Sequence, residues 1–469
     1  MLSQFGALTL AQETQFSELP LEVVALVFLR LPLDARLRAR EVSQGWRALL
    51  NEPRFWLVLD FSHGSGVEAR LTQALLFAAG ERGRGHLHTL DLTGTEGLRT
   101  AHLAQFAAMH AQSLRTVTVP EEVEFSAKKV TRLCRSAPLC TLRCYVNCDA
   151  AEALPLLRCE APCALLHIFK LYVHGFGSNW QQVLDFAAAL PSHRGKIKDL
   201  TVSTFPLENV AVADALMRGI AEARVRDVTF YNCCLRPASL PGLTRLLEAG
   251  CLERLNIDNV RRLWLFEASP DLTAFCHALR SSTLQALELY RCELWRDPAA
   301  ADELLAALVG HSTLSELSLY SHRLNVDTDD ARRVVGEHLA PLITHTSALQ
   351  KLELTEIDLG KAGLAPIFEA LHRSNTLKEL SVSAVFHPSS ALLSLNPYCL
   401  IGLPVIDAAE ISRDFARDVI LPAVRANSSL RKLKVFMRGG NDGTIPELVK
   451  AQAVVAARTQ PAVGAIIAA

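Results

Sequence analysis

The residues of this chain best suited to metal chemistry are five cysteines at four-residue spacing. They are Cys140, Cys144, Cys148, Cys159 and Cys163. Cysteine thiolates bind zinc, but structural zinc sites are typically built from C-x2-C pairs. No such pair occurs in the sequence, and Cys144 falls at a buried position of the strand pattern described below. We therefore predict no zinc site.

The other reactive residue types also lack the partners that catalysis needs. His63, His86 and His88 lie close together in sequence, but no H-E-x-x-H motif accompanies them. The glycine-rich stretches at 64–66 and 83–85 lack the lysine and the spacing of a phosphate-binding loop, and we interpret them as linker. No nucleophile elbow or kinase motif is present. We predict no catalytic residue, no metal and no cofactor, and therefore a protein that is not an enzyme.

Composition excludes several further classes of function. The chain has 469 residues with 48 Lys plus Arg and 49 Asp plus Glu, so the formal net charge is -1. A nucleic-acid-binding protein usually carries a basic excess, and none exists here. No stretch of about 18 apolar residues predicts a membrane span, and no basic, apolar start predicts a signal peptide. The 12 cysteines are then expected to stay reduced, in the cytoplasm or the nucleus.

The dominant sequence signal is a repeated L-x-x-L-x-L motif. The copy at Leu284, Leu287 and Leu289 is free of substitutions, and copies recur every 23 to 35 residues. Thirteen copies begin at residues 87, 114, 139, 168, 197, 225, 252, 284, 314, 349, 377, 400 and 430. Between the strand motifs, segments such as 301–309 place leucines at helical spacing. Each unit is therefore one strand and one helix, and only a stack of units can bury their apolar faces.

This pattern resembles the ribonuclease-inhibitor-like class of leucine-rich repeats, in unit length and in the cysteine that follows several strands. The resemblance covers 87–436 and implies an α/β solenoid with parallel strands on the concave face and helices outside. Two units are long, and we predict protruding loops at 260–270 and 326–339. The segment 387–407 is irregular and carries no assignment.

Strand alternation assigns side chains to the concave face. The residue after the third apolar position of each motif points out of this face. In the middle repeats this position places three of the 6 tyrosines of the chain in one row with an aspartate. Tyrosine is enriched at protein-binding hot spots, although aromatic residues also favour strands for packing reasons alone. We predict a partner-binding surface formed by Tyr231, Asp258, Tyr290 and Tyr320.

The N-terminal segment has a different, helical character. Pro20 suits the first turn of a helix, Val23, Val27 and Leu31 form one apolar stripe, and Pro32 ends the helix. The segment 34–50 has a second helical pattern. Leu19-Pro20, Val42-Ser43-x-x-Trp46 and Trp56 occur at the spacing typical of an F-box, so residues 17–56 resemble that family. Arg36 and Glu41 depart from it, because many members carry apolar residues there.

The F-box resemblance implies a Skp-type adaptor as partner and, through it, a cullin. The repeats would then hold a protein substrate for ubiquitin transfer and subsequent degradation. The residues that the resemblance assigns to adaptor binding are Leu19, Pro20, Val23, Val27, Leu31, Val42 and Trp46. For Val42 and Trp46, a role in the small core of the module is an open alternative.

A second interpretation of the whole chain also remains open at this stage. The helical module would only cap the solenoid, and the protein would be a plain interaction scaffold. Exposure of Val23, Val27 and Leu31 would favour adaptor binding, whereas packing on Leu71, Leu75 and Leu76 would favour the cap. The predicted organisation is a flexible N-terminus (1–16), an F-box-like module (17–60), a linker with a first helix (61–86), a repeat solenoid (87–445) and a C-terminal helix or tail (446–469).

Overall fold

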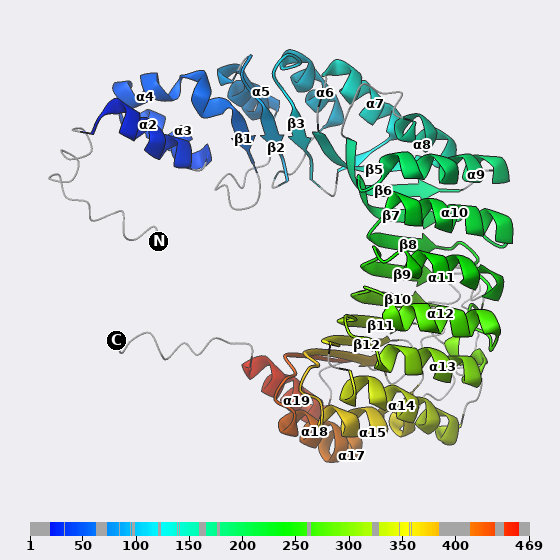
Figure 1. Cartoon of the computed structure of the whole chain (residues 1–469). Coiled ribbons are helices and arrows are strands. Elements are labelled where there is room, and N and C mark those ends of the chain that lie inside the picture. The colour runs from blue at the N-terminus through cyan, green and yellow to red at the C-terminus, as the bar shows by residue number, and fades with distance from the viewer. Residues whose placement is uncertain are drawn as a thin grey trace, which may run out of the picture. The chain divides into compact units, whose positions relative to one another are not determined.

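A computed structural model gives the fold of the chain (Figure 1). It describes residues 19–31, 33–61, 73–83, 85–93, 95, 99–120, 123–137, 139, 141–158, 166–175, 179–259, 264–320, 328–346, 348–355, 357, 359–383, 413–436 and 445–458. Internal contacts divide the chain into two units. Unit 1 is Met1–Cys148 with Glu152–Tyr172, and unit 2 is Asp149–Ala151 with Val173–Ala469.

Unit 1 begins with the predicted helical module. It consists of helix α2 (Leu21–Arg30), helix α3 (Leu33–Val42), helix α4 (Gln44–Leu50) and the 3-10 turn η2 (Pro53–Trp56). Ser43 caps α4 by accepting a hydrogen bond from the backbone N–H of Trp46 at 3.1 Å, which explains the serine in the Val-Ser-x-x-Trp motif. Trp56 is fully buried, and its indole N–H donates to the Leu50 carbonyl at 2.6 Å.

The rest of unit 1 alternates strands and helices. Its strands pair in the order β1-β2-β3-β5-β6, and β4 pairs with β5. These strands are β1 (Val58–Asp60), β2 (Thr89–Asp91), β3 (Thr116–Thr118), β4 (Glu124–Phe125), β5 (Thr141–Asp149) and β6 (Leu166–His174). The intervening helices are α5 (Gln73–Arg82), α6 (Thr100–Met109), α7 (Ala127–Ser136) and α8 (Ala150–Leu157), the last of which starts in unit 2.

Unit 2 repeats the same strand–helix alternation. Its strands pair in chain order from β7 to β14. They are β7 (Ile197–Ser203), β8 (Asp227–Tyr231), β9 (Arg254–Asp258), β10 (Ala286–Tyr290), β11 (Glu316–Tyr320), β12 (Lys351–Thr355), β13 (Glu379–Ser383) and β14 (Lys432–Phe436). Each of the seven pairings between neighbouring strands from β7 to β14 is parallel, as predicted from the repeat.

The helices of unit 2 lie along one face of its sheet (Figure 1). They are α9 (Trp180–Ala189), α10 (Val210–Ala223), α11 (Leu240–Glu248), α12 (Pro270–Ser281), α13 (Pro298–Val309), α14 (Asp329–Thr344), α15 (Gly360–Leu371), α17 (Arg413–Phe415), α18 (Leu421–Ala426) and α19 (Pro446–Ala457). Shorter turns are η3 (Leu190–His193), η4 (Pro237–Ser239), η5 (Leu294–Arg296) and the π-helical η6 (Ala416–Ile420). We call the opposite face of this sheet, which the helices do not cover, the strand face.

The leucines of the motif form the core between the two layers. Leu287, Leu317 and Leu352 are in register across β10, β11 and β12, and all are buried. On the helix side, Leu304 and Leu308 of α13 are buried as well. Burial of each such side chain contributes about 1.5–3 kcal/mol, so the stack of units, and not any single unit, stabilises the fold.

The turns after the strands connect each repeat to both of its neighbours. Cys233 follows β8, and its thiol donates to the Val202 carbonyl of the preceding repeat at 3.2 Å. Asn232 adopts a φ of 53°, and its N–H donates to the Asp258 carbonyl of the next repeat at 2.7 Å. Burial raises the pKa of Cys233 to about 12, so this thiol is a hydrogen-bond donor and a core group, not a nucleophile.

The turns from helix to strand are closed by buried polar side chains that the repeat pattern did not predict. The imidazole Nδ1 of His311 accepts from the backbone N–H groups of Thr313 and Leu314. Asn427 does the same for Leu430 at 2.7 Å and also donates to the carbonyls of Leu371 and Ser374. These bonds satisfy backbone groups that would otherwise be buried without partners.

The structure differs from the sequence-based expectations in four places. The sheet begins earlier than Leu87, because β1 pairs with β2. The short strand β4 is additional. The prediction of a loop at 326–339 is wrong, since helix α14 starts at Asp329 with Thr328 as its N-cap. The repeat count predicted a further strand between β13 and β14, but these two strands pair directly; the weak copy at Leu400 lies among residues 384–412, outside the described part.

Candidate functional site

Helix α2 and Leu19 just before it expose a group of large apolar side chains, which we call the α2 patch. The patch consists of Leu19, Leu21, Val23, Leu26, Val27 and Leu29. Leu26 is 64% exposed and Val23 is 39% exposed, whereas Val24, Ala25 and Phe28 of the same helix are buried. Contiguous exposed apolar residues on a folded module mark a binding surface.

The structure separates the seven residues assigned to adaptor binding into two groups. Five of them, Leu19, Pro20, Val23, Val27 and Val42, are exposed. Leu31 and Trp46 are half-buried, and the Trp46 ring packs edge-on against Phe28 with 4.9 Å between ring centroids. Trp46 thus contributes to the module's own core.

Three members of the α2 patch were missed by the sequence interpretation. Leu21, Leu26 and Leu29 lie outside the predicted stripe of Val23, Val27 and Leu31. A helix whose large apolar residues are not confined to one stripe must expose some of them, and that signal was available in the sequence.

The two departures from the F-box pattern have different structural roles. Arg36 is buried, and its guanidinium donates to the Phe55 carbonyl and lies over the Trp56 ring. Burial lowers the pKa of Arg36, and the negative charge of Asp60 opposes this effect. The Arg36 side chain therefore packs inside the module, whereas Glu41 is exposed.

The second candidate surface is the predicted row on the strand face. Tyr231, Asp258, Tyr290 and Tyr320 occupy matching register positions on β8 to β11, so they lie side by side as predicted. Tyr231 is exposed and the other two tyrosines are half-buried. The rings of Tyr290 and Tyr320 are 5.2 Å apart between centroids and are tilted by 41°, which is within the range of favourable aromatic pairs.

Asp258 has a partner within the chain. The carboxylate accepts two short hydrogen bonds from Nη2 of Arg291, at 2.7 Å and 2.6 Å, and one from Nε at 3.0 Å. Burial raises the pKa of Asp258, and Arg291 acts in the opposite direction. Arg291 adopts a φ of 57° directly after β10, and this left-handed turn places its side chain over the neighbouring strand. Asp258 therefore fixes the turn, and it has little surface left for a partner.

Glu288 is the polar centre of this region. Its Oε2 accepts from Asn256 Nδ2 at 2.9 Å and from the Tyr290 hydroxyl at 3.3 Å. Burial raises the pKa of Glu288. Burial and the negative charges of Glu288 and Glu353 raise the pKa of Tyr290, so the phenol remains a neutral hydrogen-bond donor.

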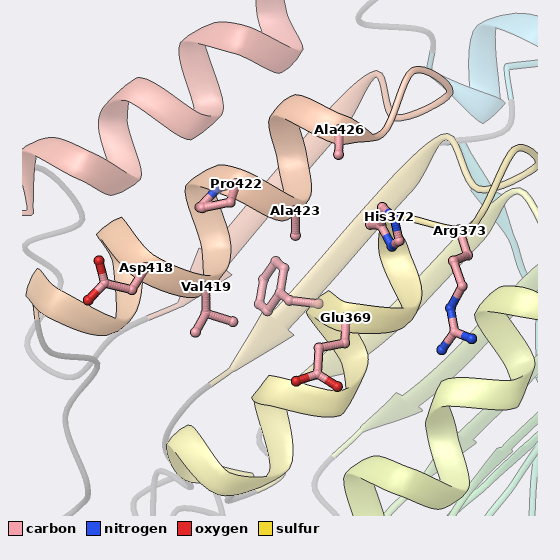
Figure 2. A pocket seen from close by; sticks show the side chains of 9 residues that line it. Glu369, His372, Arg373, Asp418, Val419, Pro422, Ala423 and Ala426 are labelled. Carbon is pink, nitrogen blue, oxygen red and sulfur yellow. The ribbon is translucent and has the colours of Figure 1, made fainter.

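A groove of about 600 Å³ lies between α15 and the η6–α18 segment, away from both candidate surfaces in sequence (Figure 2). Phe368, Val419 and Ala423 line it with apolar surface, and Glu369 and Arg373 add charge. No sequence pattern predicted this groove, and none of the predicted site residues lines it.

The cysteines first considered as zinc ligands are divided by the structure. Cys144 and Cys148 are buried side chains of β5, while Cys140, Cys159 and Cys163 lie outside the described residues. Within the described part of the chain, no three His, Cys, Asp or Glu side chains could hold a metal ion. Among the same residues, no helix combines the length and apolar character that a membrane span requires.

Comparisons with known proteins identify one part of the chain. No curated protein sequence matches it. A solved structure titled "Crystal structure of TLR13-ssRNA13 complex" matches at 13% identity with a TM-score of 0.27, covering 79% of this chain and 57% of that chain. The match thus spans less than two thirds of that protein. Its TM-score is too low to support a shared fold or function.

The family model described as F-box domain matches residues 16–58. The match encloses α2, α3, α4 and η2, together with the α2 patch and Trp46. It agrees with the resemblance drawn from Leu19-Pro20 and Val42-Ser43-x-x-Trp46. The chain therefore carries an F-box domain at residues 16–58, ahead of a series of strand–helix repeats.

Proposed function

We propose that this protein is the substrate-recognition subunit of a ubiquitin ligase of the Skp–cullin–F-box type. An F-box domain supports such a role in general. In this proposal the F-box domain binds a Skp-type adaptor, which is held by a cullin, and the repeats hold a protein substrate. The chain itself performs no chemistry; it raises the effective concentration of the substrate near the transfer machinery, which leads to degradation of the substrate.

The single observation that carries the adaptor proposal is the exposure of the α2 patch. Val23 and Val27 are 39% and 38% exposed, so part of their apolar surface has no cover among the described residues. A cap that served only to close the solenoid would turn its apolar residues inward. The exposed patch favours adaptor binding over the scaffold interpretation, and burial of the patch in a complex would remove its contact with water.

The proposal for the repeats rests on the strand face of unit 2. Tyr231, Tyr290 and Tyr320 present aromatic surface with polar tips, which is typical of residues that anchor protein partners. We assign substrate binding to these three tyrosines and a supporting role to Asp258, whose carboxylate orders the Arg291 turn.

Two further features support finer assignments. Units of one strand and one helix, with Cys233 and Cys292 bonding to the preceding repeat, favour the ribonuclease-inhibitor-like repeat class. The eight cysteines that the described part of the chain contains are free thiols. A reducing compartment fits this state, so we propose that the protein acts in the cytoplasm or the nucleus.

The test is binding of the purified full-length chain to a recombinant Skp-type adaptor, measured by calorimetry. Val23→Glu/Val27→Glu should abolish binding, because two charges in the patch would be buried without partners. The matched control is Val334→Glu/Val449→Glu, where the side chains are 39% and 44% exposed on repeat helices; it should bind like the wild type.

A second variant, Leu19→Ala/Pro20→Ala, removes contact area without adding charge and should weaken binding. Circular dichroism of every variant checks that the fold is retained. If the intact, folded chain does not bind the adaptor, the scaffold interpretation replaces the ligase proposal.

A further inference from the structure

The strand face of β9 to β12 carries more carboxylates than its own cations neutralise. Arg291 pairs with Asp258 at 2.6 Å. Glu316 takes both of the remaining cations, Arg254 at 3.4 Å and Lys351 at 3.6 Å.

Two carboxylates are left over by this pairing. Glu288 and Glu353 have no ion-pair partner among the described residues. They lie in register on either side of Ser318, on β10 and β12.

The same region has hydrogen-bond acceptors that the chain does not fill. Asn256 donates its amide N–H to Glu288, but its Oδ1 atom is buried and has no hydrogen-bond partner in the described part of the chain. The hydroxyl of Thr355, a residue that is 5% exposed and in register with Tyr320, is also buried there without a partner. An unfilled buried polar atom is costly, so a ligand with several donors would be stabilised here.

Aromatic rings stand directly beside these carboxylates. Tyr290 and Tyr320 follow Glu288 and Ser318 by two residues on the same face of their strands, and their rings form a pair with 5.2 Å between centroids. The faces of aromatic rings attract cations, and the attraction grows when the cation is withdrawn from water. Rings and acidic oxygens together define the chemistry of a complementary ligand.

We propose that Glu288, Glu353, Tyr290 and Tyr320 form a subsite for an arginine side chain of a bound protein segment. The planar guanidinium stacks on a tyrosine ring, and its N–H groups donate to the carboxylates of Glu288 and Glu353. An arginine suits the subsite better than a lysine, because it offers five donors in a rigid plane and also stacks on aromatic faces. The inference rests on the proposal that the strand face holds the substrate, and it names the substrate class as proteins with an exposed basic segment.

The experiment uses the purified full-length chain and a fluorescein-labelled peptide in which three arginines alternate with glycine and serine. Fluorescence anisotropy gives the dissociation constant. Glu288→Gln and Glu353→Gln should each weaken binding about tenfold, the loss expected for a charge-assisted hydrogen bond. Tyr290→Ala should weaken it as well.

The matched control is Glu379→Gln, which removes one carboxylate from the strand face at β13, where Lys432 pairs with it at 3.0 Å. This variant should change the affinity by less than about twofold. A peptide with citrulline in place of arginine should lose binding, and a lysine peptide should bind more weakly than the arginine peptide. Equal binding of the citrulline peptide, or an equal loss in Glu379→Gln, would overturn the subsite.

The adaptor takes no part in this measurement, so a failed F-box test does not affect its outcome. The variant Tyr231→Ala/Tyr290→Ala/Tyr320→Ala separates the remaining cases. In one case the triple variant loses a co-purifying protein partner, and the wild type does not bind the arginine peptide. The strand face then holds a substrate of another chemistry, and the arginine subsite is wrong. In the other case the triple variant keeps that partner, and the wild type binds the arginine peptide. The arginine subsite is then supported, and the proposal that the tyrosines hold the substrate fails.

Discussion

Two helices of this chain have similar apolar content and opposite surroundings. In α2 of the F-box domain, Leu21, Leu26 and Leu29 are exposed. In α13 of the solenoid, Leu304, Leu305 and Leu308 are buried. A repeat helix is flanked by the helices before and after it, whereas much of the apolar surface of α2 has no covering element among the described residues. The difference teaches that apolar periodicity alone identifies a helix, and that its neighbours decide whether the apolar face is core or binding surface.

The largest expected effect comes from applying one substitution to both helices. Leu304→Ala should lower the free energy of unfolding by about 2–5 kcal/mol, because it leaves a cavity in the packed layer. Leu26→Ala should change it by less than about 0.5 kcal/mol, since the side chain is 64% exposed. Urea denaturation followed by circular dichroism measures both values. Equal losses would show that the α2 patch is covered within the chain.

A glycine in each region extends the comparison to backbone packing. A methyl group at Gly336 of α14 would overlap the carbonyl of Gly363 on α15, whereas at Gly45 of α4 its nearest neighbour is Ser43 Oγ at 4.0 Å. Gly336→Ala should lower the free energy of unfolding by about 1–3 kcal/mol because of this overlap. The overlap outweighs the roughly 1 kcal/mol by which alanine is favoured over glycine inside a helix. Gly45→Ala should stabilise the F-box domain by about 0.5–1 kcal/mol. Hydrogen exchange at the amides of α14 and α4 would report each effect locally, and stabilisation by Gly336→Ala would contradict the close helix approach.

The last expected effect concerns acidification of the solenoid core. Burial, and secondarily the positive charge of Lys196, lower the pKa of His193 from 6.5 to about 4. The unfolded chain therefore binds a proton more readily, and this contribution to stability is present above about pH 6.5 and is lost as the pH falls toward 4. His193→Gln should flatten that part of the stability profile. The control His277→Gln changes an exposed histidine of α12 and should leave the profile unchanged; an equal response of both variants would contradict the prediction.

Sequence predicted the repeat strands well because their spacing is a direct consequence of burial. Each L-x-x-L-x-L motif whose strand is described places its leucines or their substitutes in the core, as Leu287 and Leu317 illustrate. The motif could not predict the sheet order near its end. Leu400, Leu403 and Val405 have the correct spacing, yet β13 pairs directly with β14, because pairing depends on which strand is adjacent in space.

The candidate site was predicted only in its coarse arrangement. Alternation along each strand placed the tyrosine row correctly, since register carries it from one repeat to the next. The pairing of Asp258 with Arg291 depends on a left-handed residue after β10, and no spacing rule signals that conformation in an arginine. The burial of Arg36 similarly depends on the fold of η2, which places the Phe55 carbonyl within its reach.

The direct pairing of β13 with β14 has a consequence for how such a chain changes over generations. Glu379 and Lys432 meet across these strands although 53 positions separate them in sequence. The entropy of closing a loop grows only with the logarithm of its length, by about 0.6 kcal/mol for each doubling. An insertion between β13 and α17 therefore adds little further loop-closure entropy, so the pairing of β13 with β14 can be retained. A segment gained here by duplication or insertion leaves the strand face of β8 to β12 unchanged.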